Sequence, residues 1–224
     1  MSELSPRLEV FPQAQRLLWP NLQPAAALGF ALYGGTAIAL RLGHRTSVDF
    51  DLFCATPLDR SALFSTMPFL KAAHVLQDSP DALTFLVVPR TGSSETVKVS
   101  FFGSITFGRV GAPQWTSDRV VQVASPEDLL GTKLKVILQR VESKDYIDTA
   151  AILESGTSLA LGLGAARALF GPSFQPSECI KALVYFEGGD LEVLSRQVKD
   201  RLIASVTTVG DLPQISVLEH RLTL

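Results

Sequence analysis

Two glycines and two aspartates stand at opposite ends of one short, mostly apolar segment, YGGTAIALRLGHRTSVDFDLF at residues 33–53. Residues 47–53 alternate and are rich in strand formers, which predicts a β-strand. Residues 36–43 are good helix formers that end in Gly43, which predicts a helix that begins on the glycines and stops there. A helix followed directly by a strand restricts the chain to folds that combine helices with a sheet.

The two aspartates lie two positions apart on the predicted strand. Side chains at this spacing share one face of a sheet, about 7 Å apart, so Asp49 and Asp51 can both reach one divalent cation. Buried without a counter-charge, each carboxylate would be costly. Phe50 and Leu52 point to the opposite face and can pack into a core. Asp49 and Asp51 are therefore the predicted metal ligands.

The glycine turn suits the binding of a phosphate. Gly34, Gly35 and Thr36 come just before the predicted helix, where bare backbone N–H groups can approach an anion closely. The hydroxyl of Thr36 adds a hydrogen bond, and Arg45, in the loop before the strand, could bind a phosphate through its forked guanidinium. A phosphate at the turn and a metal at the acids is the arrangement used in phosphoryl or nucleotidyl transfer.

The composition is that of a globular protein. The chain has 224 residues, of which 46% are hydrophobic and 19% charged, which suits one large domain or two small ones. Its net charge of −2 gives no overall basic field. Cys54 and Cys179 lie far apart, so neither a zinc site nor a disulfide framework is indicated. Without an apolar run of membrane length or a signal peptide, we expect a cytoplasmic protein.

The remaining elements are predicted from periodicity and turn residues. They are helices at 7–19 and 57–77, and strands at 81–89, 95–103 and 120–125, with turn residues 90–94 joining two of these strands as a hairpin. A strong helix start follows, with Ser125 as N-cap and Pro126 at the first helical position. Glycine and proline clusters, 162–164 among them, are expected to interrupt the helical pattern beyond it. The predicted fold class is α+β, with a mixed sheet flanked by helices over 1–122 and a helical region over 123–224.

At these residues a family resemblance appears. GGTAIALRLGHRTSVDFDLF resembles the signature of the nucleotidyltransferases of the AbiEii/AbiGii toxin family, minimal members of the polymerase-beta-like superfamily. That signature is Gly-Gly/Ser-Thr/Ser, a spacer, and Asp-x-Asp, and twelve residues lie here between Thr36 and Asp49. Residues 125–153, SPEDLLGTKLKVILQRVESKDYIDTAAIL, resemble the later Lys…Arg…Lys-Asp-x-x-Asp block of the family.

The resemblance implies a nucleotidyltransferase-like sheet and a Mg²⁺-dependent transfer of NMP from an NTP to an acceptor hydroxyl. It makes RNA, particularly a tRNA 3′ end, a reasonable acceptor. It also implies the toxin of a bacterial toxin–antitoxin or abortive-infection pair, with a cognate antitoxin protein as a partner. Lys133 is implied to contact the nucleotide phosphates, and Asp145 or Asp148 to complete the site.

A charged stripe accompanies the second block. If residues 126–153 are close to one helix, Lys133, Arg140 and Asp148 fall within roughly 80° of one another at about 100° per residue. The stripe could face the two aspartates, or it could be an ion-pair stripe on a half-exposed helix. The predicted catalytic residues are Asp49, Asp51, Lys133 and Asp148, and the predicted nucleotide-binding residues are Gly34, Gly35, Thr36, Arg45, Lys133, Arg140 and Asp145.

The chain departs from the superfamily at a third carboxylate. The position expected for it, on the strand VKVSFF at 97–102, is Ser100. Two alternatives follow. The protein could be a nucleotide-binding or regulatory module that keeps the fold without transfer, or a nucleotidyltransferase that modifies a small molecule such as an antibiotic.

Overall fold

The computed structural model describes residues 3–89 and 95–224, and it divides into two compact units. The first unit comprises Met1–Gly108, Ala112–Ala124 and Glu219–Leu224, and the second comprises Arg109–Gly111 and Ser125–Leu218. The sequence predicts two contiguous regions divided at 122. The main division of the structure comes after Ala124, and the last residues of the chain return to the first unit.

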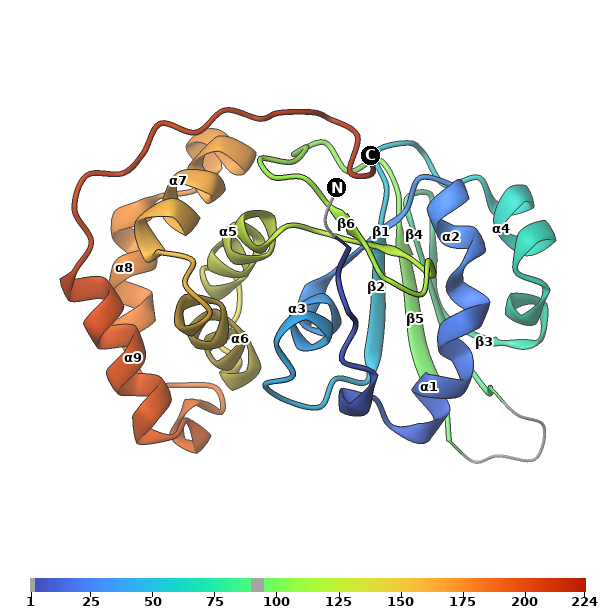
Figure 1. Cartoon of the computed structure of the whole chain (residues 1–224), viewed down its shortest axis with the longest axis horizontal. Coiled ribbons are helices and arrows are strands. Elements are labelled where there is room, and N and C mark those ends of the chain that lie inside the picture. Colours follow the sequence, from blue (N-terminus) through green and yellow to red (C-terminus); the bar gives the residue numbers. More distant parts are fainter. Residues whose placement is uncertain (1–2, 90–94) are drawn as a thin grey trace. The chain divides into compact units, whose positions relative to one another are not determined.

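The first unit is built on a mixed sheet (Figure 1). Its strands are β1 (Ala31–Tyr33), β2 (Asp49–Phe53), β3 (His74–Ser79), β4 (Ala82–Val87), β5 (Val97–Phe102), β6 (Gln114–Trp115) and β7 (Gln122–Val123), in the order β3-β4-β5-β2-β1-β7-β6. β2 pairs antiparallel with β1 and parallel with β5, which places β2 inside the sheet. The antiparallel pairing of β4 with β5 confirms the predicted hairpin, whose turn residues 90–94 lie outside the described residues.

Helices cover both faces of this sheet. They are η1 (Leu8–Val10), α1 (Gln13–Leu18), η2 (Trp19–Leu22), α2 (Pro24–Ala27), α3 (Gly34–Leu42), α4 (Arg60–Thr66) and η3 (Pro68–Ala72). Figure 1 shows α3 on one face and α1 and α2 on the other. Phe50 of β2 points toward α1, with its ring centroid 5.4 Å from that of Phe11 and 5.9 Å from that of Trp19. The apolar face of β2 therefore packs into the core on the α1 side.

The helix predicted over 57–77 is wrong in its last part, because His74–Ser79 forms β3. All but the last residue of β3 are exposed, and β3 is an edge strand that pairs only with β4. Its extended conformation is thus set by backbone pairing with β4. The strand has no alternation of buried and exposed side chains, so its sequence lacks the pattern by which a strand is recognised.

The second unit is helical. Its helices are α5 (Pro126–Ile137), α6 (Ser143–Glu154), α7 (Leu159–Phe170), η4 (Gly171–Ser173), α8 (Pro176–Val184), η5 (Leu191–Val193) and α9 (Arg196–Thr207). α5 contacts α6, α7 and α8. As predicted, Ser125 caps α5 by accepting a hydrogen bond from the backbone N–H of Asp128, and Pro126 begins the helix. Within the described residues, no helix is long and apolar enough to cross a membrane.

The interruption predicted at 162–164 is wrong, because these residues lie inside α7. A Cβ atom added to Gly162 would fall 2.3 Å from Cδ2 of Leu130 on α5. The glycine therefore allows α5 and α7 to pack closely. The local sequence does not distinguish a glycine with this role from one that ends a helix.

Candidate active site

The acid pair lies on β2, on the sheet face opposite to the core contacts of Phe50. Phe50 and Leu52 are completely buried, whereas the side chains of Asp49 and Asp51 emerge from the other face and are partly exposed. The alternation along the strand produces this separation, because successive side chains point to opposite faces. The two carboxylates are thus displayed together on a strand that the core holds in place.

Gly34 brings the start of α3 against one of these carboxylates. Its φ of +71° lies in the left-handed region, and a Cβ atom added there would fall 2.5 Å from Oδ2 of Asp51. Both the backbone conformation and the lack of space require glycine. The N-cap residue, Tyr33, makes no side-chain capping hydrogen bond, and backbone N–H groups at the start of a helix attract anions. The predicted turn and the predicted acids therefore meet at one place.

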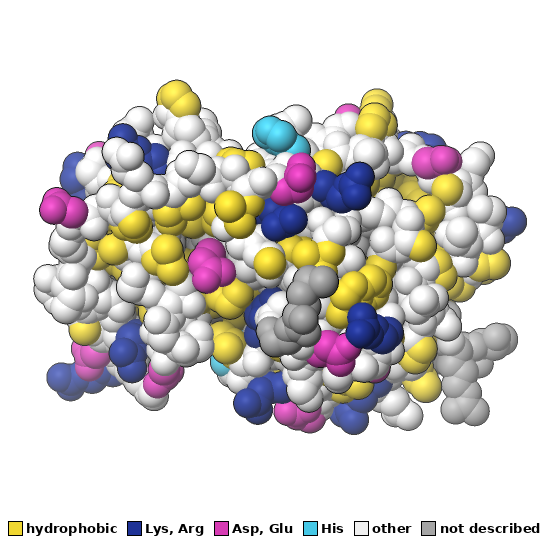
Figure 2. All heavy atoms as spheres, turned by 45° about the horizontal axis from the view of Figure 1, so that its top comes forward, with side chains coloured by type: hydrophobic (Ala, Val, Ile, Leu, Met, Phe, Trp, Pro, Cys, Tyr) yellow, Lys and Arg dark blue, Asp and Glu magenta, His cyan; other side chains and the backbone are white. Residues whose placement is uncertain are grey.

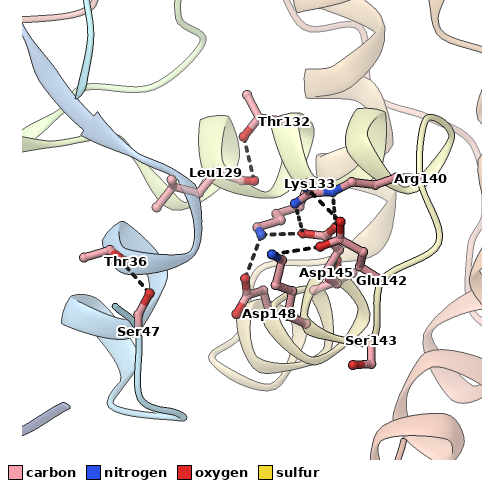
Figure 3. A network of polar contacts seen from close by, with 12 residues as sticks. Thr36, Ser47, Leu129, Thr132, Lys133, Arg140, Glu142, Ser143, Asp145 and Asp148 are labelled. Atoms are coloured by element: carbon pink, nitrogen blue, oxygen red, sulfur yellow. Dashed lines mark hydrogen bonds and ion pairs between the residues drawn. The ribbon is translucent and has the colours of Figure 1, made fainter. Parts of the chain in front are cut away.

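Thr36 makes hydrogen bonds within the protein. Its side chain is buried, its hydroxyl lies 2.7 Å from Oγ of Ser47 (Figure 3), and it donates a short hydrogen bond to the carbonyl of Asp49. These contacts tie the first turn of α3 to the start of β2. The hydroxyl thus holds the backbone at Asp49, and its predicted hydrogen bond to a phosphate stays a prediction.

The parallel strand β5 adds a residue that the sequence reasoning missed. Lys98 is the partner of Asp49 in the β2–β5 ladder, and its Nζ lies 3.0 Å from Oδ2 of that aspartate. Ser100 is the partner of Asp51 and is buried, with its hydroxyl accepting a hydrogen bond from Thr84 on β4. The sequence signal that could have identified Lys98 was its position two residues before Ser100, because residues two positions apart on a strand share one face of the sheet.

The donor set suits a cation that arrives with a phosphate ligand. Among the described residues, no group of three or more His, Cys, Asp or Glu side chains could hold a metal ion. Asp49 and Asp51 supply two carboxylates here. Mg²⁺ in nucleotide enzymes is commonly held by one or two carboxylates together with substrate phosphates, so the two acids fit such an ion.

The loop between α3 and β2 holds Arg45. The side chain is half-buried, and its guanidinium donates a hydrogen bond of 2.9 Å to the carbonyl of Thr46. Arg45 belongs to the same unit as the acid pair and lies in the loop that leads to it.

The second block forms a buried ionic cluster in the helical unit. Nζ of Lys133 lies 2.7 Å from Oδ1 of Asp145 and 2.7 Å from Oδ2 of Asp148, and both aspartates are completely buried (Figure 3). Nε of Arg140 lies 2.9 Å from the other oxygen of Asp145. Sequence reasoning left the choice between the two aspartates open, and the structure brings both to Lys133.

The single helix assumed for this block is wrong. α5 ends at Ile137 and α6 begins at Ser143, so Lys133 meets the two aspartates across a pair of packed helices. Residues 138–142 contain neither glycine nor proline, so the sequence carries no strong breaking signal there.

Asp190 holds the start of α6, a role that sequence reasoning missed. The backbone N–H and the hydroxyl of Ser143 donate to its two carboxylate oxygens over 2.6 and 2.7 Å. These hydrogen bonds lower the pKa of Asp190 below its ordinary value. The preceding Gly189 has a φ of +54°, and a Cβ atom there would fall 2.1 Å from the carbonyl of Val141. The signal in the sequence was the Gly-Gly-Asp at 188–190, which suits a tight turn before a capping residue.

The acid pair belongs to the first unit and the Lys133 cluster to the second. Each of them is a compact constellation within its own unit. The predicted alignment of the charged stripe with Asp49 and Asp51 joins the two units and stays a prediction.

Comparison with known proteins identifies a family. Residues 16–176 match the family described as nucleotidyl transferase AbiEii toxin of type IV toxin–antitoxin systems. An uncharacterized protein of Aquifex aeolicus strain VF5 is 29% identical over 181 residues, which are 77% of this chain and 82% of that protein.

Solved structures share the fold. An antigenic nucleotidyltransferase-like protein from Paracoccidioides brasiliensis has a TM-score of 0.57 at 16% identity, covering 92% of this chain and 96% of that one. MenT4, a nucleotidyltransferase toxin from Mycobacterium tuberculosis H37Rv, has a TM-score of 0.53 at 13% identity, covering 85% and 82%. The α+β architecture with a mixed sheet is therefore that of nucleotidyltransferases.

Proposed function

The chain belongs to the AbiEii family of nucleotidyltransferase toxins, and we propose that it transfers NMP from an NTP to an acceptor hydroxyl at the β2–α3 site. The observation that carries the proposal is the close approach of Gly34 to Asp51. It supports the proposal because the start of a helix, where backbone N–H groups could bind a phosphate, lies beside a pair of carboxylates.

Each part of the site then has a role. The backbone N–H groups at Gly34, Gly35 and Thr36 bind and orient the phosphates. Asp49 and Asp51 would hold Mg²⁺ together with phosphate oxygens, and the bound ion would stabilise the negative charge that develops there. Thr36 acts through the backbone of Asp49, which its hydroxyl keeps in place.

The reaction itself is a displacement at the α-phosphorus. The acceptor oxygen forms a bond to this phosphorus, the bond to the oxygen bridging to the β-phosphate breaks, and pyrophosphate leaves. The hydroxyl proton passes to water, because Ser100 takes the place of a third acid and supplies no carboxylate base. We therefore attribute the catalytic effect to positioning and charge stabilisation.

In the second unit, the proposed contact of Lys133 with the nucleotide must be made by an ammonium that already binds Asp145 and Asp148. The two aspartates hold this ammonium in a defined place. We assign Lys133 to phosphate binding, and Asp145 and Asp148 to fixing its position, with Arg140 supporting Asp145.

RNA, with a tRNA 3′ end as the first candidate, is the proposed acceptor, and membership in a toxin family supports a cognate antitoxin as a partner. Basic and acidic side chains are intermingled on the face drawn in Figure 2. On α6 and its approach, the described Arg140 and Lys144 both pair with Glu142. RNA would therefore be recognised locally, near its reacting end, with few phosphate contacts elsewhere.

A labelling experiment tests this function. The purified chain is incubated with Mg²⁺, total bacterial RNA and each α-labelled NTP in turn, beside the double variant Asp49→Ala/Asp51→Ala and the exposed control Glu9→Gln. We expect label in RNA with the wild type and Glu9→Gln, and none with the double variant. Equal labelling by the double variant would exclude the β2 site, and label in an added aminoglycoside instead of RNA would assign a small-molecule acceptor.

A further inference from the structure

A lysine stands beside the acids of β2. Lys98 is the partner of Asp49 in the parallel ladder, and their charged groups lie 3.0 Å apart. Residues two positions apart share a sheet face, so Lys98 and Ser100 lie on the same side as Asp49 and Asp51. The site therefore combines two carboxylates with one ammonium group.

The ammonium of Lys98 weakens the binding of a divalent cation that arrives without a nucleotide. An ion that binds Oδ2 of Asp49 must displace the ammonium of Lys98, and it then finds two carboxylates in the described part of the chain, where no larger cluster of metal-ligating side chains exists. Mg²⁺ and Mn²⁺ need several more oxygen ligands. A cation that arrives with a triphosphate brings those oxygens with it, together with negative charge that the displaced ammonium can bind.

The lysine is also free to move from one partner to the other. The side chains of Lys98 and Asp49 are 39% and 34% exposed, and ion pairs of this exposure contribute little to stability. The lysine stem is flexible, and its ammonium has three donors that suit phosphate oxygens. Moving from Asp49 to a phosphate thus costs little and needs no change in the backbone of β5.

We infer that Lys98 is a built-in counter-ion of the acid pair and a nucleotide-binding residue. It neutralises Asp49 while the nucleotide is absent, so that a divalent cation enters only together with the nucleotide, and it then binds a phosphate oxygen. The inference rests on the proposed function, because it describes how the same site selects a cation–nucleotide complex over the cation alone.

The first test measures Mn²⁺ binding without nucleotide, by the electron paramagnetic resonance signal of free Mn²⁺. Lys98→Met is compared with the full-length wild type, with Lys98→Arg, which keeps the charge, and with Lys71→Met, which removes an exposed lysine elsewhere in the same unit. We expect Lys98→Met to bind Mn²⁺ about tenfold more tightly than the wild type, and the two controls to behave as the wild type. Adding Asp49→Asn to Lys98→Met should abolish the gain.

The second test measures the affinity for α,β-methylene analogues of the four NTPs in the presence of Mn²⁺. Lys98→Met should bind the preferred analogue about tenfold more weakly, whereas Lys98→Arg and Lys71→Met should not. Lys98→Gln serves as a second neutral variant, and a melting temperature close to that of the wild type shows that the fold is kept.

The inference is overturned if Lys98→Met and Lys98→Gln bind free Mn²⁺ no more tightly than the wild type, or if their affinity for the analogue is unchanged. The Mn²⁺ titration contains no nucleotide and no acceptor. If Lys98→Met gains Mn²⁺ affinity but the wild type labels no acceptor, the counter-ion role of Lys98 is supported and the proposed transferase activity is contradicted. If the wild type labels an acceptor but Lys98→Met gains no Mn²⁺ affinity, the transferase activity is supported and the counter-ion role is contradicted.

Discussion

At the scale of single residues, Gly34 connects the fold to the site most directly. Its left-handed backbone starts α3, and its missing side chain leaves room for the carboxylate of Asp51. A second glycine, Gly29, also has a positive φ, of +83°, but no atom lies within 4 Å of an added Cβ. Both positions therefore need a residue that tolerates a positive φ, but of the two only Gly34 lies against the acid pair.

A comparison of Gly34→Ala with Gly29→Ala should therefore distinguish the effect of backbone strain on stability from the effect of the site geometry on nucleotide binding. Each should cost about 1–2 kcal/mol of unfolding free energy, because L-residues disfavour the left-handed region. Only Gly34→Ala should also lower NTP affinity, by about tenfold or more, since its Cβ must displace Asp51. Urea unfolding and nucleotide titration measure both effects, and equal NTP affinity in the two variants would contradict the site.

Lys133 is the residue for which stability and activity are most easily confused. Lys133→Met leaves Asp145 and Asp148 buried without their shared ammonium, so we expect a loss of about 3 kcal/mol or more in unfolding free energy. Lys135→Met, on the same helix but more exposed, should cost less than about 1 kcal/mol. Denaturant unfolding of both variants checks this, and a Lys133→Met protein as stable as the wild type would show that the cluster is not a structural necessity.

At the scale of elements, helix α6 depends on a residue far along the chain. Asp190 accepts two hydrogen bonds from Ser143 at the first position of the helix, and α6 carries both buried aspartates of the cluster. The segment 188–190 thus positions Asp145 and Asp148 without contacting Lys133. It gives the region beyond 156 a definite part in building the ionic cluster.

The effect of pH tests this cap. Because its hydrogen bonds lower the folded-state pKa of Asp190, the stabilisation is present above the unfolded pKa of about 4 and is lost as the pH falls through the folded-state pKa. Asp190→Asn should thus lower the melting temperature at pH 7, and the difference from the wild type should shrink below about pH 4. Asp200→Asn, an exposed control in α9, should show no such trend, and a difference that persists at low pH would refute the cap.

At the scale of the whole molecule, the chain does not divide at a single point. Residues 219–224 return to the unit that contains the sheet, where Leu222 is completely buried and the backbone N–H of Leu224 donates to Oε1 of Gln122 over 2.8 Å. The last residues are thus part of the folding unit of the acid pair, although a helical region precedes them in sequence.

Leu222→Ala should therefore destabilise the first unit. Removing a fully buried leucine side chain costs about 2–5 kcal/mol, whereas Leu218→Ala, at a position that is 65% exposed, should change stability by less than about 0.5 kcal/mol. Thermal unfolding, followed by the fluorescence of Trp19 and Trp115 in the first unit, measures the difference. Equal melting temperatures for the two variants would show that the C-terminal segment is not anchored.

The parts of the site that depend on neighbouring residues could be predicted without knowledge of the structure. The alternation along 47–53 predicts both acids on one face, the glycines predict the start of α3, and Ser125 with Pro126 predicts the start of α5. Strand periodicity, left-handed glycine and helix capping act over a few positions, so they can be recognised without knowledge of the fold.

Contacts between distant residues could not be predicted in this way. The pairing of Lys98 with Asp49 depends on the register of β5 against β2, and the cluster of Lys133 with both aspartates depends on a helix break that no glycine or proline marks. The hydrogen bond from the Thr36 hydroxyl to the carbonyl of Asp49 and the return of residues 219–224 to the first unit also depend on the tertiary structure. Strand register, helix packing and burial arise from contacts between segments far apart in the chain, and no local pattern records them.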